Sequence, residues 1–178
     1  EPEVYYPLKV MVCSSCRLVQ VDEYKKSSDI FNQDYAYFSS YSSSWLQHSK
    51  RYTDLMMDRF GYSTSDLVVE IASNDGYLLQ YFKEKGIPVL GIEPTANTAA
   101  VAQDKGIETI VDFFGQPLAN KLTDQGKKAK LLLGNNVLAH VPDINDFVGG
   151  LKILLSGDGV ITMEFPHLYQ LVKNNQFD

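Results

Sequence analysis

The sequence predicts an α/β protein with a mostly parallel sheet flanked by helices, and three observations support this fold class. After residue 66, short apolar segments of strand length alternate with segments of helical length. The turns between them carry Gly, Pro, Asn, Asp or Ser, which favour turn conformations. The 178 residues are 44% hydrophobic and 21% charged, which is typical of a globular core. Strands that alternate with helices imply βαβ units and hence a parallel sheet.

Each expected strand is a short run rich in Val, Ile and Leu, and each of the first four is followed by a helix. The strands are expected at residues 67–72, 89–93, 108–111, 129–133 and 160–164. The helices are expected at residues 77–85, 95–105, 116–123 and 142–155, with a turn at 156–159 before the last strand. Gly86 and Gly106 follow two of these helices, at positions where glycine commonly ends a helix.

The part before this sheet has a different residue composition, and we divide the chain into three segments. Residues 1–26 are expected to form short strands around a Cys-x-x-Cys turn, as a partial zinc-binding module. Residues 27–66 are expected to form an aromatic and Ser-rich linker and an amphipathic helix, and residues 67–178 the sheet domain. The helical stripe, with a serine cap before it and Gly61 after it, comprises Trp45, Tyr52, Leu55, Met56, Arg59 and Phe60.

The two cysteines of the chain are Cys13 and Cys16. In a reducing compartment, this spacing is more often a metal half-site or a redox pair than a structural disulfide. A structural zinc ion takes four ligands, and the three histidines are far away in the sequence. A redox pair is expected at a helix N-terminus, whereas a strand-like segment follows here. We interpret the pair as half of a zinc site; an inert remnant and a redox pair are the alternatives.

Charge and hydropathy restrict the partners. The net charge is −6, and the absence of a basic block argues against a nucleic-acid partner. No apolar run approaches the roughly 18 residues of a membrane span, and no secretion leader is visible. The chain begins with Glu1 rather than Met, which indicates a fragment. We therefore expect a cytoplasmic protein, monomeric or weakly dimeric, that acts on a small molecule.

The candidate binding residues follow the expected strands, because ligands of open parallel sheets bind beyond the carboxyl ends of the strands. The first strand supplies Glu70, Ala72, Asn74, Asp75, Gly76 and Tyr77. The next three supply Glu93 and Pro94, then Asp112, Phe113 and Phe114, then Asn135, Asn136 and Val137.

The charge of the first turn favours one cofactor over another. Binding of a dinucleotide needs Gly-x-Gly-x-x-Gly, whereas this turn has one glycine and two carboxylates. An acid there would repel a pyrophosphate but suits S-adenosylmethionine, which carries an ammonium and a sulfonium group. Glu93 is placed to accept hydrogen bonds from ribose hydroxyls, which both cofactors possess. The expected cofactor is therefore S-adenosylmethionine, with an NAD-dependent oxidoreductase as an alternative.

Some of these residues also have a purely structural interpretation. Asp75 is a candidate cap for the following helix. Glu93 is a candidate residue of an ordinary surface turn. Residues 112–114 are candidates for a helix cap with core aromatics. In the competing interpretation, a phenylalanine of this group packs against adenine and Asp112 lies near the exocyclic amine.

Several motifs, in order along the whole chain, carry a family resemblance. The segment 69–79 (VEIASNDGYLL) resembles the first motif of the S-adenosylmethionine-dependent C-methyltransferases that act on nucleotide-activated deoxysugars. Further matches are CSSCRLVQ at 13–20, YAYFSS at 35–40, GIEP at 91–94 and NVLAHVPD at 136–143. The resemblance implies a Rossmann-like class I methyltransferase fold between a zinc module and a C-terminal domain. It also implies a further Cys-x-x-Cys upstream of Glu1 and a Tyr-His-Glu-His segment beyond Asp178.

Methylation of a carbon needs a base that removes a proton beside a carbonyl, and histidine is the usual candidate. His140 follows the fourth expected strand, and the resemblance places it in the active site; a role in fixing the neighbouring asparagine loop is the alternative. Tyr35 matches a family tyrosine near the donor methyl group, with a packing role as the alternative. For His48, Glu164 and His167, packed or surface positions are favoured.

The predicted function is C-methylation of a nucleotide-linked keto-deoxysugar through an enolate and in-line methyl transfer. Protein side chains contribute to such a transfer mainly by positioning and by exclusion of water. Three alternatives remain: methylation of another small molecule, an NAD-dependent nucleotide-sugar oxidoreductase, and a non-catalytic zinc-linked binding module. The resemblance places further base candidates beyond Asp178, so an inactive fragment that still binds the donor is also consistent with the sequence.

Overall fold

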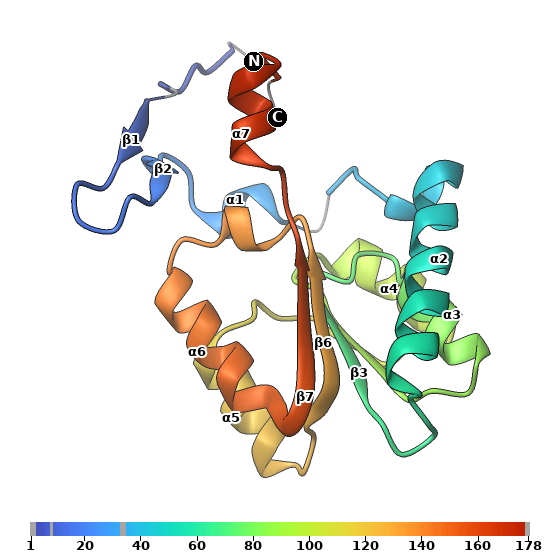
Figure 1. The fold of residues 1–178 in the computed structure, drawn as a ribbon. Helices are drawn as coiled ribbons and strands as arrows, with labels where there is room; N and C mark the ends of the chain where they lie inside the picture. The colour runs from blue at the N-terminus through green and yellow to red at the C-terminus, as the bar shows by residue number, and fades with distance from the viewer. Residues whose placement is uncertain (1–2, 8, 33–34, 177–178) are drawn as a thin grey trace.

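The computed structural model describes residues 3–7, 9–32 and 35–176 (Figure 1). Each of the three segments expected from the sequence therefore includes residues outside the described part of the chain. The expected continuation beyond Asp178 also lies outside it.

A five-stranded sheet forms the centre of the molecule, in the order β5-β4-β3-β6-β7. Its strands are β3 (Val68–Ile71), β4 (Val89–Ile92), β5 (Thr109–Ile110), β6 (Ala129–Asn135) and β7 (Leu155–Glu164). All four pairings are parallel, which confirms the predicted sheet. The chain builds outward from β3 to β5 and then returns to place β6 on the other side of β3. This reversal creates a switch point, where ligands of such sheets bind.

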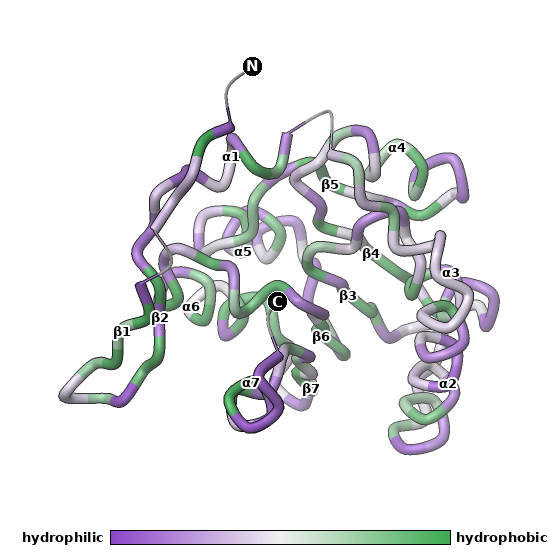
Figure 2. The backbone as a smooth tube through the Cα atoms, turned by 90° about the horizontal axis from the view of Figure 1, so that it is seen from above, coloured by the Kyte–Doolittle hydropathy of each residue, from purple (hydrophilic) through white to green (hydrophobic). Residues whose placement is uncertain are grey.

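Helices cover both faces of the sheet, as Figure 2 shows from above. The helices that follow the first four strands are α3 (Leu79–Glu84), α4 (Ala96–Asp104), α5 (Gln116–Asp124) and α6 (Ile144–Leu154). The core has two buried clusters because alternate residues of a strand point to opposite faces. In β6, Leu131 and Leu133 pack with α3 residues such as Phe82, whereas Leu132 packs with Leu122 of α5 and Phe147 of α6.

The last strand differs from its prediction. The turn expected at 156–159 lies within β7, which begins directly after α6. Leu155 pairs with Ala129, and the next pair joins Val160 to Leu131. Four residues of β7 thus face one residue of β6, so the turn-forming sequence makes a bulge in a continuous strand. An ion pair between Lys130 and Asp158 closes this bulge.

Helix α2 (Ser43–Phe60) confirms the predicted helix and its ends. The Ser42 hydroxyl accepts a hydrogen bond from the Trp45 amide at 3.3 Å. Gly61 follows the helix with φ of 63°, a left-handed conformation that glycine adopts readily. The predicted stripe was wrong at Leu55 and Phe60, which are 57% and 39% exposed, and Arg59 is exposed as well. Met56 is buried as predicted, with Trp45 and Tyr52 packed against the same core cluster. Ser49 and Thr53 complete this buried face, at spacings of four and three up to Met56.

The segment before α2 is more ordered than expected. Strands β1 (Val10–Val12) and β2 (Val19–Val21) form the predicted hairpin around the cysteine turn. The expected linker contains helix α1 (Ser27–Ile30) and the 3₁₀ helix η1 (Ser39–Tyr41). Helix α7 (Leu168–Lys173), after β7, was not predicted. Within the described part of the chain, no helix combines the length and apolar composition that crossing a bilayer requires.

Candidate functional site

A cavity of about 400 Å³ opens beyond the carboxyl ends of the strands, between the sheet and the segment 27–45. Most of the residues predicted from the sequence line it: Tyr35, Ala72, Asn74, Tyr77, Glu93, Pro94, Asp112, Phe113, Phe114, Asn135, Asn136, Val137 and His140. Five predicted residues do not line it: Cys13, Cys16, Glu70, Asp75 and Gly76. The structure thus brings the candidate residues after β3, β4, β5 and β6 together around one space.

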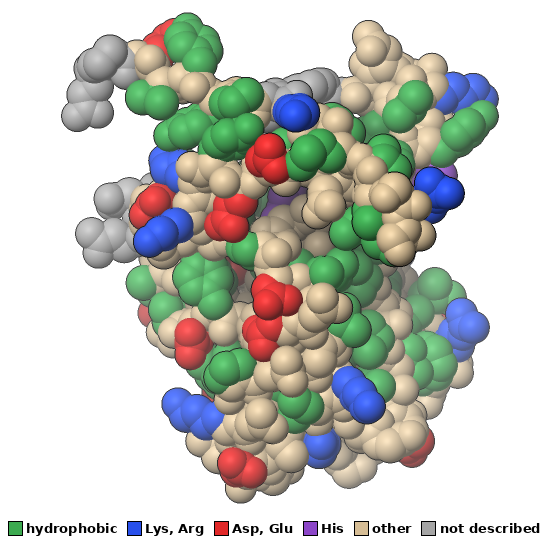
Figure 3. Space-filling model, turned by 90° about the vertical axis from the view of Figure 1, so that its left-hand side faces the viewer, with side chains coloured by type: hydrophobic (Ala, Val, Ile, Leu, Met, Phe, Trp, Pro, Cys, Tyr) green, Lys and Arg blue, Asp and Glu red, His purple; other side chains and the backbone are tan. Residues whose placement is uncertain are grey.

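The charged side chains that line the cavity are mostly acidic. They include the carboxylates Glu93, Asp112, Asp143 and Asp146, and no lysine or arginine occurs among the described lining residues. In Figure 3, acidic side chains gather around a hollow in the face that carries α6. Aromatic rings supply much of the remaining wall, among them Trp45 and Phe113. A cavity of this composition suits a ligand with positive charge and a flat apolar group.

Glu93 is a fixed carboxylate in this wall. Its side chain is only 4% exposed, and both of its oxygens accept hydrogen bonds. Oε2 accepts from the Asn74 amide at 2.8 Å, and Oε1 accepts from the amide and hydroxyl of Thr95 at 2.8 and 2.5 Å. These bonds join the loop after β3 to the loop after β4. The carboxylate is therefore held in place before any ligand arrives.

The loop after β3 has an unusual backbone. Ala72, Asn74 and Gly76 have φ values of 55°, 49° and 74°, in the left-handed region that L side chains rarely adopt. Gly76 is required for a second reason, since a Cβ there would lie 2.5 Å from Ile107 Cδ1. The backbone therefore turns back on itself directly beneath the cavity.

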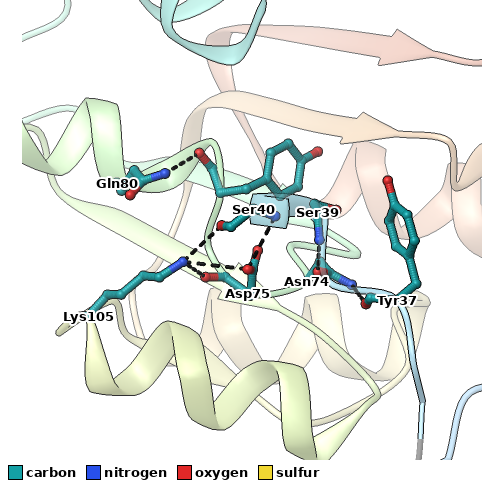
Figure 4. Close-up of polar contacts among 8 residues, drawn as sticks. Tyr37, Ser39, Ser40, Asn74, Asp75, Gln80 and Lys105 are labelled. Atoms are coloured by element: carbon teal, nitrogen blue, oxygen red, sulfur yellow. Dashed lines mark hydrogen bonds and ion pairs between the residues drawn. The ribbon is translucent and has the colours of Figure 1, made fainter. Parts of the chain in front are cut away.

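Segment 35–41 crosses this loop and is held to it by two polar anchors (Figure 4). In the first, Asn74 Oδ1 accepts from the Ser39 amide at 2.8 Å, and Asn74 Nδ2 donates to the Tyr37 carbonyl at 3.0 Å. Asn97 adds a bond from its Nδ2 to the Tyr35 carbonyl at 2.7 Å. The segment thereby becomes one wall of the cavity.

The second anchor is built on Asp75, which is 2% exposed. Its Oδ2 accepts from the Ser40 amide at 3.3 Å and lies 3.6 Å from Lys105 Nζ. Lys105 also donates to the Ser40 hydroxyl at 3.0 Å and to the Asp75 carbonyl at 2.7 Å. Asp75 does not cap helix α3, whose N-cap residue is Leu78 and lacks a side-chain bond. The carboxylate is thus turned to a neighbouring segment, and the acidity of the cavity comes from other residues.

Glu70 lies behind the cavity, fully buried in β3. Neither carboxylate oxygen has a hydrogen-bond partner among the described residues. Burial raises the pKa of Glu70 well above its usual value, against a smaller lowering by the nearby Tyr77 hydroxyl. Tyr77 separates Glu70 from the cavity, and its hydroxyl accepts from Asn135 Nδ2 at 3.0 Å. Burial, and then the charge of Glu70, raises the pKa of Tyr77 as well.

Residues 112–114 had two interpretations, a helix cap with core aromatics or contacts to adenine, and the structure fits each in part. Asp112 Oδ1 accepts from the amide of its neighbour Phe113 at 2.8 Å, while Gly115 takes the N-cap position of α5. Phe114 packs edge-to-face on Phe147, with ring centroids 5.4 Å apart, and belongs to the core. Phe113 is 45% exposed at the cavity. Phe113 is therefore the ring available to a ligand.

The two predicted catalytic residues approach the cavity from different segments. His140 ends the 3₁₀ helix η2 (Leu138–His140) after β6 and is exposed. Tyr35 precedes η1, and burial together with the negative charge of Glu93 raises the pKa of its hydroxyl. The Tyr35 hydroxyl therefore keeps its proton at neutral pH and is available as a hydrogen-bond donor beside the cavity.

The cysteines form a tight turn between β1 and β2. The Cys13 amide donates to the Leu18 carbonyl at 2.9 Å, and the Arg17 amide donates to the Cys13 carbonyl at 3.0 Å. The backbone amides of Cys16 and Ser15 lower the pKa of the Cys13 thiol. In the described part of the chain, no group of three or more His, Cys, Asp or Glu residues could hold a metal ion. The two thiols supply half of a tetrahedral zinc site, so these residues alone do not fit a zinc ion.

Sequence reasoning missed several lining residues. Ser27, Phe31, Tyr37, Ser39, Trp45, Val141, Pro142, Asp143, Asp146 and Phe147 line the cavity without having been selected. The aromatic content of the expected linker was a signal for two of them, Phe31 and Tyr37, because a simple spacer has no need of tyrosine and phenylalanine. Asp143 and Asp146, which follow η2, are better explained by a helix start than by a binding site. Asp143 caps α6 by accepting hydrogen bonds from the amides of Asn145 and Asp146.

Comparison with known proteins shows that the chain is similar to methyltransferases in sequence. The chain is 38% identical over 176 residues to the C-methyltransferase NovU of Streptomyces niveus, covering 99% of this chain and 42% of that protein. It is 23% identical over 116 residues to a ubiquinone biosynthesis O-methyltransferase of Azorhizobium caulinodans, covering 61% of this chain and 46% of that protein. The chain thus spans less than half the length of these curated relatives. No family model matches the chain.

Solved structures give the same fold at low sequence identity. An S-adenosylmethionine-dependent methyltransferase of Clostridium acetobutylicum superposes with a TM-score of 0.58 at 13% identity, covering 72% of this chain and 54% of that one. The plantazolicin methyltransferase BpumL, solved with a substrate analogue and SAH, gives a TM-score of 0.57 at 13% identity, covering 72% and 49%. The fold is the Rossmann-like methyltransferase fold. Within this methyltransferase fold, the cavity lies at the switch point between β3 and β6.

Proposed function

We propose that the chain binds S-adenosylmethionine in this cavity and belongs to an enzyme that methylates a carbon atom. The observation that carries the proposal is the set of lining carboxylates with no lysine or arginine among the described lining residues. S-adenosylmethionine brings a sulfonium and an ammonium group, which such a cavity attracts. The pyrophosphate of NAD would find carboxylates in place of cations, so the oxidoreductase alternative is disfavoured.

The relatives support this choice of cofactor. NovU is named a C-methyltransferase, and two further structures of the plantazolicin enzymes, like the one above, contain SAH, the demethylated product of the donor. In this chain, Glu93 would accept hydrogen bonds from the ribose hydroxyls. Phe113 would pack against the adenine ring, with Asp112 near its exocyclic amine. Asn135, Asn136 and Val137 would border the methionine part of the donor, while Glu70, Asp75 and Gly76 shape the loop from behind.

Donor and acceptor need different chemistry from these residues. The sulfonium is already a good leaving group, so the protein mainly aligns the two reactants and excludes water. Methylation of carbon also needs an enolate, and we assign removal of the proton to His140. The Tyr35 hydroxyl, which stays protonated, would donate a hydrogen bond to the carbonyl oxygen as negative charge develops there.

We further propose that the acceptor is a nucleotide-linked keto-deoxysugar. Two observations support this: the motifs along the chain that resemble the sugar C-methyltransferases, and the similarity to NovU over 99% of the chain. A keto-sugar has the carbonyl that an enolate mechanism requires. The chain covers only part of such relatives, so turnover is assigned to the whole protein.

Isothermal titration calorimetry tests the cofactor directly. The chain is titrated with SAH and, separately, with NAD. We expect SAH to bind and NAD to bind more weakly or not at all, because no described cation faces the pyrophosphate. Tighter binding of NAD would overturn the proposal.

The acceptor is tested with the whole protein and a methyl-labelled donor. Nucleotide-linked keto-sugars are offered as acceptors, and carbon NMR of the product identifies the atom that carries the label. We expect a carbon-bound methyl group beside the carbonyl. A label on oxygen, or labelling only of acceptors without a sugar, would contradict this part of the proposal.

A further inference from the structure

Two side chains far apart in the sequence meet beside the cavity and belong to none of the roles above. His48 Nε2 lies 3.1 Å from Glu164 Oε2, and the two residues are 116 positions apart. One helical turn further along α2, the Tyr52 hydroxyl bonds the Thr162 hydroxyl at 2.5 Å. The two contacts join one face of α2 to alternate residues of β7. They therefore fix the position of the helix against the end of the last strand.

The His48 ring is also stacked on the Trp45 indole, with centroids 5.0 Å apart and 13° between the planes. Trp45 in turn stacks on Tyr77 at 5.9 Å and 30°. The Tyr77 hydroxyl accepts from Asn135, whose register partner on β7 is Glu164. The contacts thus form a closed ring from His48 back to Glu164.

Three members of this ring, Trp45, Tyr77 and Asn135, line the cavity, whereas His48 and Glu164 lie outside the lining. The order of the strands shows on which side of the cavity Trp45, Tyr77 and Asn135 lie. Glu93 and Asp112 follow β4 and β5, on one side of β3, while the ring is built on the ends of β6 and β7, on the other. If the ribose and adenine lie at the first side, the ring borders the side left for the acceptor.

We propose that His48 and Glu164 are a positioning pair that holds the Trp45 indole in the acceptor-side wall of the cavity. The inference rests on the proposed function, which defines a donor side and an acceptor side. The pair acts on Trp45 through the stacked His48 ring, which the Glu164 carboxylate holds in place.

The groups that face this pair are few. On β7 the Glu164 carboxylate is the partner, and it also contributes to the raised pKa of Tyr77. From α2 itself, Tyr52 lies one turn away and keeps its proton, because burial raises its pKa strongly. Beneath Tyr77 lies Glu70, whose pKa burial also raises.

Trp45 is the single tryptophan of the chain, so its fluorescence reports on this wall alone. His48→Gln removes the ring that stacks on Trp45, and Glu164→Gln removes the carboxylate that holds this ring. Both variants should let acrylamide quench Trp45 more strongly than in the wild type, by up to about fivefold.

The matched control is Asp54→Asn. Asp54 lies on the same helix as His48 and forms an ion pair with Lys85, which follows α3. This pair has a similar exposure, 47% and 38%, to that of Glu164 and His48, 43% and 44%. The control should leave the acrylamide quenching of Trp45 unchanged, and cooperative thermal unfolding of every variant verifies that it folds. Wild-type quenching in His48→Gln and Glu164→Gln, or a control that behaves like the two variants, would overturn the proposal.

SAH titration separates this inference from the proposed function. SAH affinity should be the same in the wild type, His48→Gln and Glu164→Gln, because the pair borders the acceptor side. A loss of SAH affinity as large as that from changing Glu93 would overturn the assignment to that side. If the wild type fails to bind SAH while both variants show the stronger acrylamide quenching, the cofactor proposal fails and the positioning of Trp45 stands.

Discussion

The Asn74 amide donates a hydrogen bond of 2.8 Å to Glu93 Oε2, and this bond joins the loops that follow two neighbouring strands. Because Thr95 holds the other oxygen, the carboxylate is oriented without help from a ligand. A carboxylate fixed in this way loses little freedom on binding, so its hydrogen bonds to a ribose contribute fully to affinity.

Replacement of Glu93 tests this arrangement. Glu93→Gln removes the charge and one acceptor, so SAH affinity should fall by about 1–3 kcal/mol in calorimetry. Glu108→Gln is the control, because Glu108 is an exposed acid paired with Lys127 at the surface. Unchanged affinity in Glu93→Gln would place the ribose elsewhere.

The anchor of segment 35–41 on Asn74 can be removed without disturbing the loop. Asn74→Gly suits the φ of 49° and deletes the bonds to Ser39 and Tyr37. Amide exchange of Ser39 should quicken about tenfold or more, as measured by hydrogen–deuterium exchange. Asn175→Gly, at a φ of 50° outside the cavity lining, is the control and should leave this amide unchanged. Equal protection in both variants would show that other contacts hold the segment.

The second anchor has a stability signature. Lys105→Met leaves the Asp75 carboxylate buried without its cation, so the free energy of unfolding in urea should fall by about 1–3 kcal/mol. Lys127→Met breaks a surface ion pair instead and should cost about 1 kcal/mol or less. The double variant with Asp75→Asn should recover part of the loss, since the two sites are coupled. Strict additivity would mean that the ion pair does not form in solution.

Glu70 should make stability depend on pH. Its pKa in the folded chain is raised well above the value of an unfolded glutamate, so the folded state holds a proton that the unfolded state has lost. Stability is therefore lost as the pH rises from the unfolded pKa toward the folded one, by at most about 1.4 kcal/mol per pH unit.

Glu70→Gln should flatten this dependence and be at least as stable as the wild type at neutral pH. Urea unfolding at several pH values measures it, with Glu84→Gln on the exposed face of α3 as the control. A wild-type stability that rises with pH over this range, and that Glu70→Gln leaves unaltered, would show that Glu70 has a partner in solution.

The sheet could be predicted because its determinants are local. The run from Leu67 to Ala72 is apolar except for Glu70 and is bounded by turn residues, and β3 occupies its centre, Val68–Ile71. Ser42 and Gly61 similarly mark the ends of α2. The turn predicted at Ser156–Gly159 was wrong, because turn-forming residues can also form a bulge within a strand that begins directly after a helix. Which choice the chain makes depends on pairing with β6, which local sequence does not encode.

The site was predictable as a set of positions but not as a set of contacts. The rule that ligands bind beyond the strand ends selected Glu93 and His140 correctly as lining residues. It could not reveal that Asp75 turns toward Ser40 and Lys105, which lie 35 residues before it and 30 after it. Nor could it pair His48 with Glu164. The expected domain limits, oligomeric state, compartment and zinc site remain predictions.

The wall formed by segment 27–45 has a practical consequence for dissecting this protein. A truncated protein that begins near residue 67 would keep the parallel sheet and the helices that follow its strands. Such a truncation would discard Phe31, Tyr35, Tyr37, Ser39 and Trp45, and with them one entire side of the cavity. It would also remove the hydrogen bonds that Asn74 and Asp75 make to Tyr37, Ser39 and Ser40. A shortened protein could thus retain a native sheet and yet present an open trough to solvent.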